Sequence, residues 1–199
     1  WRAWHSYTSE QDQAQIDAIR LTHTTADYIN TNSNNARIWA SSLRRVLSAS
    51  QTAPEQIDRQ LQYWIEKNKP LTAFYITDAT GRILHVANDT DAEFFNESRP
   101  VSEYAWFHEL KKNPDRSLPY TRFLLQRQIY ILTGYPYIKS DGSFAGVILA
   151  FINPYRFANY FHDMGGGPGS SIQLRHQQNG QLYFAENLAL DIQHTEDAK

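Results

Sequence analysis

Two features of the sequence resemble catalytic or ligand-binding motifs, but each lacks a part that the chemistry requires, and a third motif is absent altogether. His108 and Glu109 begin like the zinc-binding helix of a metalloprotease, but Lys112 stands where the second histidine is needed. The glycine-rich stretch 165–169 lacks the Gly-Lys-Ser/Thr ending of a phosphate-binding loop and precedes a strand-like run, whereas that loop precedes a helix. No Gly-x-Ser-x-Gly pentad presents a serine nucleophile. We therefore predict no catalytic residues here.

Ligands for a metal ion are also sparse. The sequence has seven histidines and no cysteine, which excludes disulfide bonds, thiolate metal sites and cysteine nucleophiles together. The glycine-rich stretch, which we interpret as a hinge, separates His162 and Asp163 from His176, and His194 lies in a polar tail. We expect no metal ion, no other cofactor and no enzymatic activity in this region.

Composition and charge narrow the range of partners. Of the 199 residues, 41% are hydrophobic and 14% are aromatic, which suffices for one domain or for one domain and part of another. The net charge is only -2 and the basic residues are scattered, so the sequence lacks the basic excess of a nucleic-acid-binding surface. No apolar run approaches the roughly 18 residues that cross a bilayer.

The first five residues, WRAWH, contain two tryptophans and no methionine. Tryptophan is enriched at the interface between membrane and water. We interpret the chain as a piece that follows a membrane helix, and a vector-derived or processed terminus is the alternative.

A long helix is expected near the N-terminus, because residues 9–48 contain neither glycine nor proline. One stripe recurs at intervals of three and four residues and comprises Ile16, Ile19, His23, Ala26, Asn30, Ser33, Ala36, Ala40, Leu43 and Leu47. A forty-residue helix would be about 60 Å long, which predicts a stalk. The run 30–35 has poor helix propensity, so it is either a polar seam in a helix pair or a break between two shorter helices.

The rest of the chain alternates between short helices and hairpins. An amphipathic helix carries Ile57, Leu61, Trp64 and Ile65, and further short helices are expected at 104–111 and 153–162. Three hairpins follow from turn-forming residues between β-prone runs: 74–76 with 83–86, 129–138 with 144–152, and 172–174 with 182–184. Tight turns make an antiparallel sheet, and with helices gathered at the N-terminal end the predicted class is α+β.

The order of these elements resembles Cache domains, also called PDC domains, of bacterial diguanylate cyclases and sensor histidine kinases. The matching stretches are 74–83 (FYITDATGRI), 102–107 (SEYAWF), 141–148 (DGSFAGVI) and 153–157 (NPYRF). The resemblance implies a long N-terminal helix followed by a PAS-like domain with a central antiparallel sheet that cups a small ligand. It implies a stalk at 1–50, a Cache domain at 51–164, and at 165–199 a hinge and terminal hairpin, or the beginning of a second Cache unit.

The resemblance also suggests where a ligand would bind. By this resemblance, Tyr104 and the aromatic residues after it face the ligand cup. Such residues suit a pocket, because a ligand pocket combines aromatic walls with a few precisely positioned polar groups. The expected ligand-binding residues are Tyr104, Trp106, Phe107, Arg122, Arg127, Tyr130, Thr133, Tyr135, Tyr137 and Asn153. The alternative for each aromatic side chain is an ordinary core position. Tyr104 and Asn153 depart from amino-acid-binding relatives, which carry an arginine and an acid at these positions, so an amino acid is a poor candidate ligand.

The implied function is that of an extracytoplasmic sensor in the bacterial inner membrane, facing the periplasm. Flanking transmembrane helices would tether it, and a homodimer through the N-terminal helix would pass the signal to a cytoplasmic output domain, with a diguanylate cyclase as first choice. The alternative is a module that binds no small molecule and serves dimerisation or protein interaction in a histidine kinase or chemoreceptor.

Overall fold

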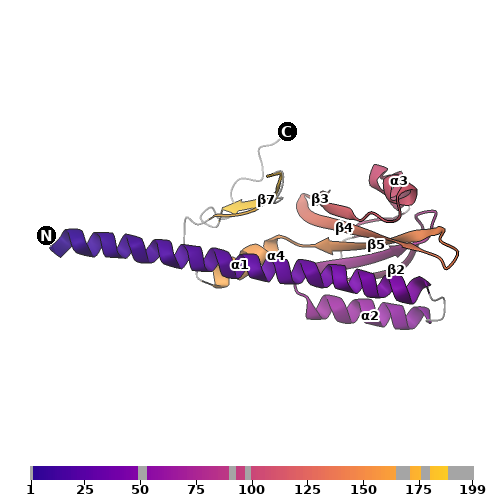
Figure 1. The fold of residues 1–199 in the computed structure, drawn as a ribbon, viewed down its shortest axis with the longest axis horizontal. Coiled ribbons are helices and arrows are strands. Elements are labelled where there is room, and N and C mark those ends of the chain that lie inside the picture. Colours follow the sequence, from indigo (N-terminus) through magenta and orange to yellow (C-terminus); the bar gives the residue numbers. More distant parts are fainter. Residues whose placement is uncertain are drawn as a thin grey trace. The chain divides into compact units, whose positions relative to one another are not determined.

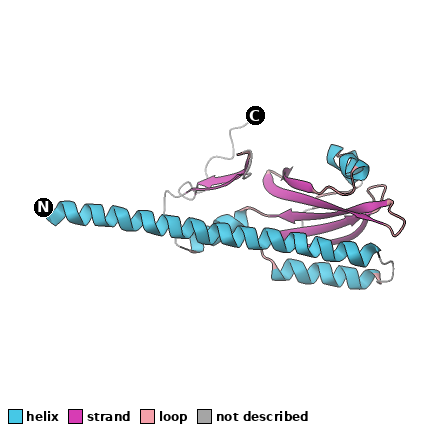
Figure 2. Ribbon diagram, viewed as in Figure 1, coloured by secondary structure: helices cyan, strands magenta, loops and turns pink. Residues whose placement is uncertain are grey.

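The computed structural model describes residues 2–48, 53–89, 93–96, 100–164, 171–175 and 180–187. In chain order the elements are α1 (Arg2–Ser48), α2 (Pro54–Lys67), β1 (Leu71–Thr77), β2 (Ile83–Asn88), the 3-10 turn η1 (Val101–Glu103), α3 (Ala105–Lys112), β3 (Leu118–Leu125), β4 (Gln128–Ile138), β5 (Phe144–Ile152), α4 (Tyr155–Asp163), β6 (Ser171–Arg175) and β7 (Leu182–Asn187) (Figure 2). The predicted α+β class, with a long helix before an antiparallel sheet, is confirmed. The predicted hinge at 165–169 lies outside the described residues.

Helix α1 is one continuous helix of 47 residues, so the polar run 30–35 does not break it. At about 1.5 Å per residue it is about 70 Å long. The predicted stripe does not stay on one face of this helix. Its N-terminal members, such as Ile16 and Ile19, are exposed, whereas Ala36, Ala40 and Leu43 are buried. The stripe repeats more often than the 3.6 residues of a straight helix, and therefore drifts around the helix surface.

The central sheet has five antiparallel strands in the order β2-β1-β5-β4-β3. The two predicted hairpins, β1–β2 and β4–β5, are both present, and their turns contain Gly81 (φ 88) and Gly142 (φ 84). A left-handed backbone of this kind favours glycine over residues with a side chain. The strands β1 and β5, which pair directly, place two hairpins that lie far apart in the sequence side by side (Figure 1).

Helix α2 and the C-terminal part of α1 cover one face of this sheet (Figure 1). The indole rings of Trp39 and Trp64 stack at 5.4 Å with an interplanar angle of 3°, which joins the two helices. Trp64 also meets the ring of Phe74 on β1 at 6.1 Å. Leu61 and Ile65 of α2 are buried in the same layer. The opposite face of the sheet is therefore left for the loops and α3.

Strand β3 (Leu118–Leu125) is an element that the sequence did not reveal. Pro119 argues against a strand, because proline cannot donate a backbone hydrogen bond to a neighbour. Its turn to β4 consists of Gln126 (φ 49) and Arg127 (φ 64), which are unusual residues for such a conformation. The strand tolerates proline because β3 is at the edge of the sheet.

Residues 1–31 and 155–199 make up a second compact unit, separate from the unit of residues 32–154. Within it, α4 packs on the N-terminal part of α1. The rings of Tyr28 and Tyr160 stack at 3.9 Å, and Tyr28 meets Phe157 edge-on at 6.0 Å. The predicted third hairpin is present as β6–β7, and Ile172 and Phe184 form a small core with α4.

None of the helices in the described part of the chain is both long enough and apolar enough to span a membrane.

Candidate functional site

The sheet face opposite α2 carries a dense group of aromatic side chains, which we call the aromatic cluster. Registers place its strand members on one face: Tyr75 pairs with Leu149, and Phe123 pairs with Tyr130. Segments outside the sheet supply the remainder. The cluster consists of Tyr75, Phe94, Phe95, Tyr104, Trp106, Phe107, Phe123, Tyr130 and Phe151.

The rings of the aromatic cluster are in direct contact. The centroids of Phe94 and Phe151 are 4.0 Å apart, and those of Phe94 and Tyr130 are 4.7 Å apart. Tyr104 and Trp106 lie 5.5 Å from one another, and both contact Phe95. The centre of this face is thus packed like a core, so a ligand would have to bind beside the cluster or displace part of it.

Residues 93–96 lie over the sheet because strand β1 holds them there. The backbone N–H of Phe94 donates a hydrogen bond of 3.2 Å to the phenol oxygen of Tyr75. Burial raises the pKa of Tyr75, and the negative charge of Glu93 raises it further, while the bond from Phe94 opposes both. The carboxylate of Glu93 is therefore close enough for its field to reach into the cluster.

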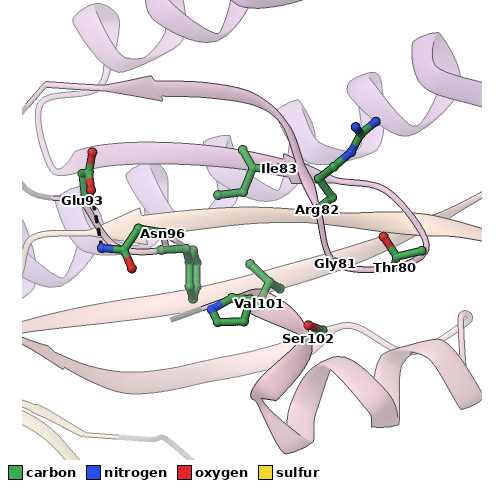
Figure 3. A pocket seen from close by; sticks show the side chains of 10 residues that line it. Thr80, Gly81, Arg82, Ile83, Glu93, Asn96, Val101 and Ser102 are labelled. Atoms are coloured by element: carbon green, nitrogen blue, oxygen red, sulfur yellow. Dashed lines mark hydrogen bonds between the residues drawn. The ribbon is translucent and has the colours of Figure 1, made fainter. Parts of the chain in front are cut away.

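A pocket of about 520 Å³ opens next to the cluster, and we call it the hairpin pocket (Figure 3). Its lining comes from the β1–β2 turn, the start of β2, the segment 93–96 and η1. The residues are Thr80, Gly81, Arg82, Ile83, Glu93, Phe95, Asn96, Pro100, Val101 and Ser102. Since Phe95 and Val101 also belong to the buried core of this face, the pocket and the cluster share a wall.

The β1–β2 turn that forms one end of the pocket is held rigidly. The carboxylate of Asp78 accepts hydrogen bonds from the backbone N–H and the hydroxyl of Thr80, at 2.8 and 2.6 Å, and from the backbone N–H of Arg82 at 3.0 Å. Burial acts to raise the pKa of Asp78, but these hydrogen bonds outweigh it and hold the pKa below its usual value. From α3, the ammonium of Lys111 donates to the carbonyl of Ala79 at 3.0 Å.

Gly81 brings this turn against η1. A Cβ at Gly81 would lie 2.9 Å from the backbone nitrogen of Ser102 and 3.0 Å from its Cβ. Such distances are shorter than real Cβ contacts, so only glycine allows the two segments to approach this closely. Gly81 and Ser102 both line the pocket at this end.

Four of the ten predicted ligand-binding residues lie together on the face of the aromatic cluster. Tyr104 and Trp106 are half-buried, while Phe107 and Tyr130 are buried. The phenol of Tyr130 donates to the side-chain oxygen of Gln128 at 2.7 Å.

Three of the predicted residues, Thr133, Tyr135 and Tyr137, lie on β4 and face away from the aromatic cluster. Thr133 pairs with Ala150 and Tyr135 with Ile148, beside Phe74 and Ile76 on the helix-covered face. The hydroxyl of Thr133 donates to the carbonyl of Leu118 at 2.9 Å.

Tyr137 has the same alternation along β4, and its phenol donates to the carbonyl of Thr77 at 2.7 Å. Burial, helped by the charge of Asp78, raises the pKa of Tyr137 to about 12. The hydroxyls of Thr133 and Tyr137 are thus engaged by strand backbones.

The other three predicted residues are spread over the edge and the end of the sheet. Arg122 on β3 and Arg127 in the β3–β4 turn are exposed. Asn153 follows β5, and its backbone N–H donates to the carbonyl of Pro70 at 2.8 Å. The structure therefore does not gather the ten residues into one site.

Sequence reasoning missed the polar lining of the hairpin pocket, namely Thr80, Arg82, Glu93, Asn96 and Ser102. Two signals were available: the Asp-x-Thr-Gly turn, and the acid- and asparagine-rich character of the irregular segment that follows β2. Neither signal says that these segments meet, because the turn and η1 are about twenty residues apart.

Among the described residues, no three histidine or acidic side chains lie close enough together to hold a metal ion. The ring of His85 is instead paired with a single carboxylate, that of Asp58, at 2.8 Å. His176 and His194 lie outside the described residues.

The fold is that of the extracellular ligand-binding sensor domains of bacterial chemoreceptors and histidine kinases, of the Cache or PDC kind. A long helix leads into a five-stranded antiparallel sheet whose second face is closed by loops and a short helix. These neighbours are described as a ligand-binding receptor and as ligand-binding domains of chemoreceptors.

Three solved structures illustrate the likeness. An extracellular ligand-binding receptor from Desulfohalobium retbaense has a TM-score of 0.60 and 18% identity, over 78% of this chain and 28% of that one. The ligand-binding domain of the Pseudomonas aeruginosa amino-acid chemoreceptor PctC, in complex with GABA, has a TM-score of 0.60 and 16% identity. The match covers 82% of this chain and 72% of that one. The ligand-binding domain of the Campylobacter jejuni chemoreceptor Tlp3, in complex with L-valine, has a TM-score of 0.56 and 17% identity. The match covers 88% of this chain and 73% of that one.

At these identities the likeness concerns the fold alone. No protein-family model matches the sequence, and no curated protein matches it significantly. The chain spans about a quarter of the Desulfohalobium receptor chain and nearly three quarters of the two chemoreceptor domains.

Proposed function

We propose that this chain is the sensory part of a bacterial membrane receptor and binds a small molecule in the hairpin pocket. The pocket itself carries the proposal. Its volume of about 520 Å³ lies in the range of small-molecule sites, and it combines apolar walls with a few polar groups. It also opens on the face of the sheet that α2 leaves uncovered.

Of the residues predicted from the sequence, Tyr104 and Trp106 are the best supported as ligand contacts. Both contact Phe95, which lines the pocket, and both are only half-buried. A ligand that pushes on Phe95 would therefore change the packing of Tyr104 and Trp106. Phe107, Tyr130, Arg122, Arg127, Thr133, Tyr135, Tyr137 and Asn153 complete the predicted set, at the positions described above.

The setting of the domain is part of the same proposal. We place it on the periplasmic side of the inner membrane, tethered by flanking transmembrane helices, because the neighbouring structures are extracellular domains of receptors. The hairpin β6–β7 with its small core supports the reading of residues 165–199 as the beginning of a second Cache unit.

Signal output would pass through a homodimer formed along α1. Ile16, Ile19 and Ile38 on this helix are exposed by 50%, 51% and 53%, and a second α1 could cover them. A ligand that prefers one arrangement of the helices would shift the population toward it. A diguanylate cyclase is the proposed output domain, on the resemblance of the sequence alone.

A screen of small metabolites by thermal unfolding tests the binding function. Compounds that raise the melting temperature should lose this effect in Ser102→Trp, which fills the pocket from η1, and in Asn96→Trp, which fills it from the opposite wall. Ser143→Trp, in the exposed β4–β5 turn, is the matched control and should keep the effect. A library without any stabilising compound, or hits that survive both blocking variants, would contradict the proposal.

A second function is favoured by the filled aromatic cluster. Because its rings contact one another as in a core, the domain could serve dimerisation or protein interaction without a ligand. A concentration-dependent dimer that no compound affects, measured by sedimentation, would favour this function.

A further inference from the structure

We infer that the hairpin pocket selects ligands carrying a protonated amine, and that Glu93 receives this group. The inference rests on the proposed binding function and adds the chemical class of the ligand. It follows from the partners of the two charged side chains on the pocket wall, Glu93 and Arg82.

Glu93 supplies a carboxylate that no positive group of the described chain neutralises. The ion pairs between described residues are Arg20–Asp17, Arg82–Asp78, His85–Asp58 and Lys112–Glu109, and none involves Glu93. Its partner is the side-chain amide of Asn96, which donates over a long 3.5 Å (Figure 3). The carboxylate thus keeps most of its capacity to accept hydrogen bonds from a cation.

Among the described residues that line the pocket, the guanidinium belongs to Arg82, and it is engaged elsewhere. Arg82 lies 3.4 Å from the second oxygen of Asp78, and its side chain is 76% exposed. In Figure 3 it points away from Glu93 and Asn96. An anionic ligand would therefore find a shared, solvated arginine at one end of the pocket and a repelling carboxylate at the other.

The middle of the pocket suits the apolar body of an amine. Ile83 and Val101 lie between the Glu93 end and the Thr80–Ser102 end of the pocket (Figure 3), and Phe95 also lines it. An ammonium group beside Phe95 would also be attracted to the aromatic ring. At the other end of the pocket, the hydroxyls of Thr80 and Ser102 could hydrogen-bond to a second polar group on a longer ligand.

The test compares three probes with the same carbon skeleton: isoamylamine, isoamyl alcohol and isovalerate. Isothermal titration at neutral pH should show the amine binding at least about tenfold more tightly than the other two, because a charge-assisted hydrogen bond is stronger than a neutral one. Added salt should weaken the amine selectively.

Variants locate the effect at Glu93. Glu93→Gln keeps the shape of the side chain, and it should reduce amine binding by about tenfold while leaving the alcohol unchanged. Glu109→Gln removes an exposed carboxylate on α3, with 68% side-chain exposure, and should bind the amine like the parent chain.

The inference is overturned if the parent chain binds the alcohol or the acid as tightly as the amine, if it binds none of the three, or if Glu93→Gln binds the amine normally. The metabolite screen separates this failure from that of the proposed function. Neutral or anionic hits that Ser102→Trp abolishes would retain the binding function and refute only the amine selectivity.

Discussion

The backbone nitrogen of Phe94 donates its hydrogen bond to the phenol oxygen of Tyr75, 3.2 Å away, and Phe94 is fully buried. Nineteen residues separate the two in sequence. The bond fixes the segment that carries Glu93, Phe95 and Asn96, and so it shapes one wall of the hairpin pocket.

Tyr75→Phe should destabilise the domain, since it keeps the ring and removes the acceptor of the Phe94 N–H. A buried donor left without a partner costs about 1–3 kcal/mol. Urea unfolding followed by tryptophan fluorescence measures the change. Tyr63→Phe on α2, where the ring is 52% exposed, is the matched control and should change stability little. Equal stabilities of the two variants would show that the bond to Phe94 contributes nothing.

Gly81→Ala and Gly142→Ala separate backbone strain from packing. Both glycines have a left-handed φ, 88 and 84, so each alanine should cost about 1–2 kcal/mol. Only at Gly81 does the new Cβ meet a neighbour, the backbone of Ser102, whereas nothing lies within 4 Å at Gly142. Gly81→Ala should therefore cost about 1–3 kcal/mol more and distort the pocket. Chemical denaturation of both variants measures the two losses of stability. Equal losses would mean that the β1–β2 turn and η1 lie farther apart than described.

Tyr137 makes stability depend on pH in the alkaline range. Its pKa rises from 10.0 to about 12 on folding, because burial disfavours the phenolate. Between these values the unfolded chain has lost the proton that the folded chain still holds, so stability is full below pH 10 and falls as pH rises toward 12. Each unit of pKa difference corresponds to about 1.4 kcal/mol.

Urea unfolding at pH 9 to 11.5 measures this dependence. Tyr137→Phe has no proton to lose and should show a shallower decline than the parent chain, although its stability at neutral pH drops with the lost bond to Thr77. A Tyr137→Phe slope equal to that of the parent chain would show that the folded phenol titrates normally.

Much of the fold followed from local patterns in the sequence. The turns at 78–81 and 139–142 were predictable because Asp and Gly encode their own geometry: Asp78 accepts bonds from the next residues, and Gly81 takes a left-handed φ. Helix α2 was predictable from the spacing of Ile57, Leu61 and Ile65, which are all buried. Such turns and helices depend on residues that are close together in the sequence, so the sequence alone is enough to predict them.

The site depended on contacts between distant segments, and the tertiary structure alone decided it. Tyr130 and Tyr135 look alike in the sequence, yet the register of β4 turns Tyr130 into the aromatic cluster and Tyr135 toward the helix-covered face. Which residues share a pocket depends on strand register and on the approach of Gly81 to Ser102. Side-chain alternation and close packing act through space, so composition and spacing could predict a domain of this class but not the residues that line its pocket.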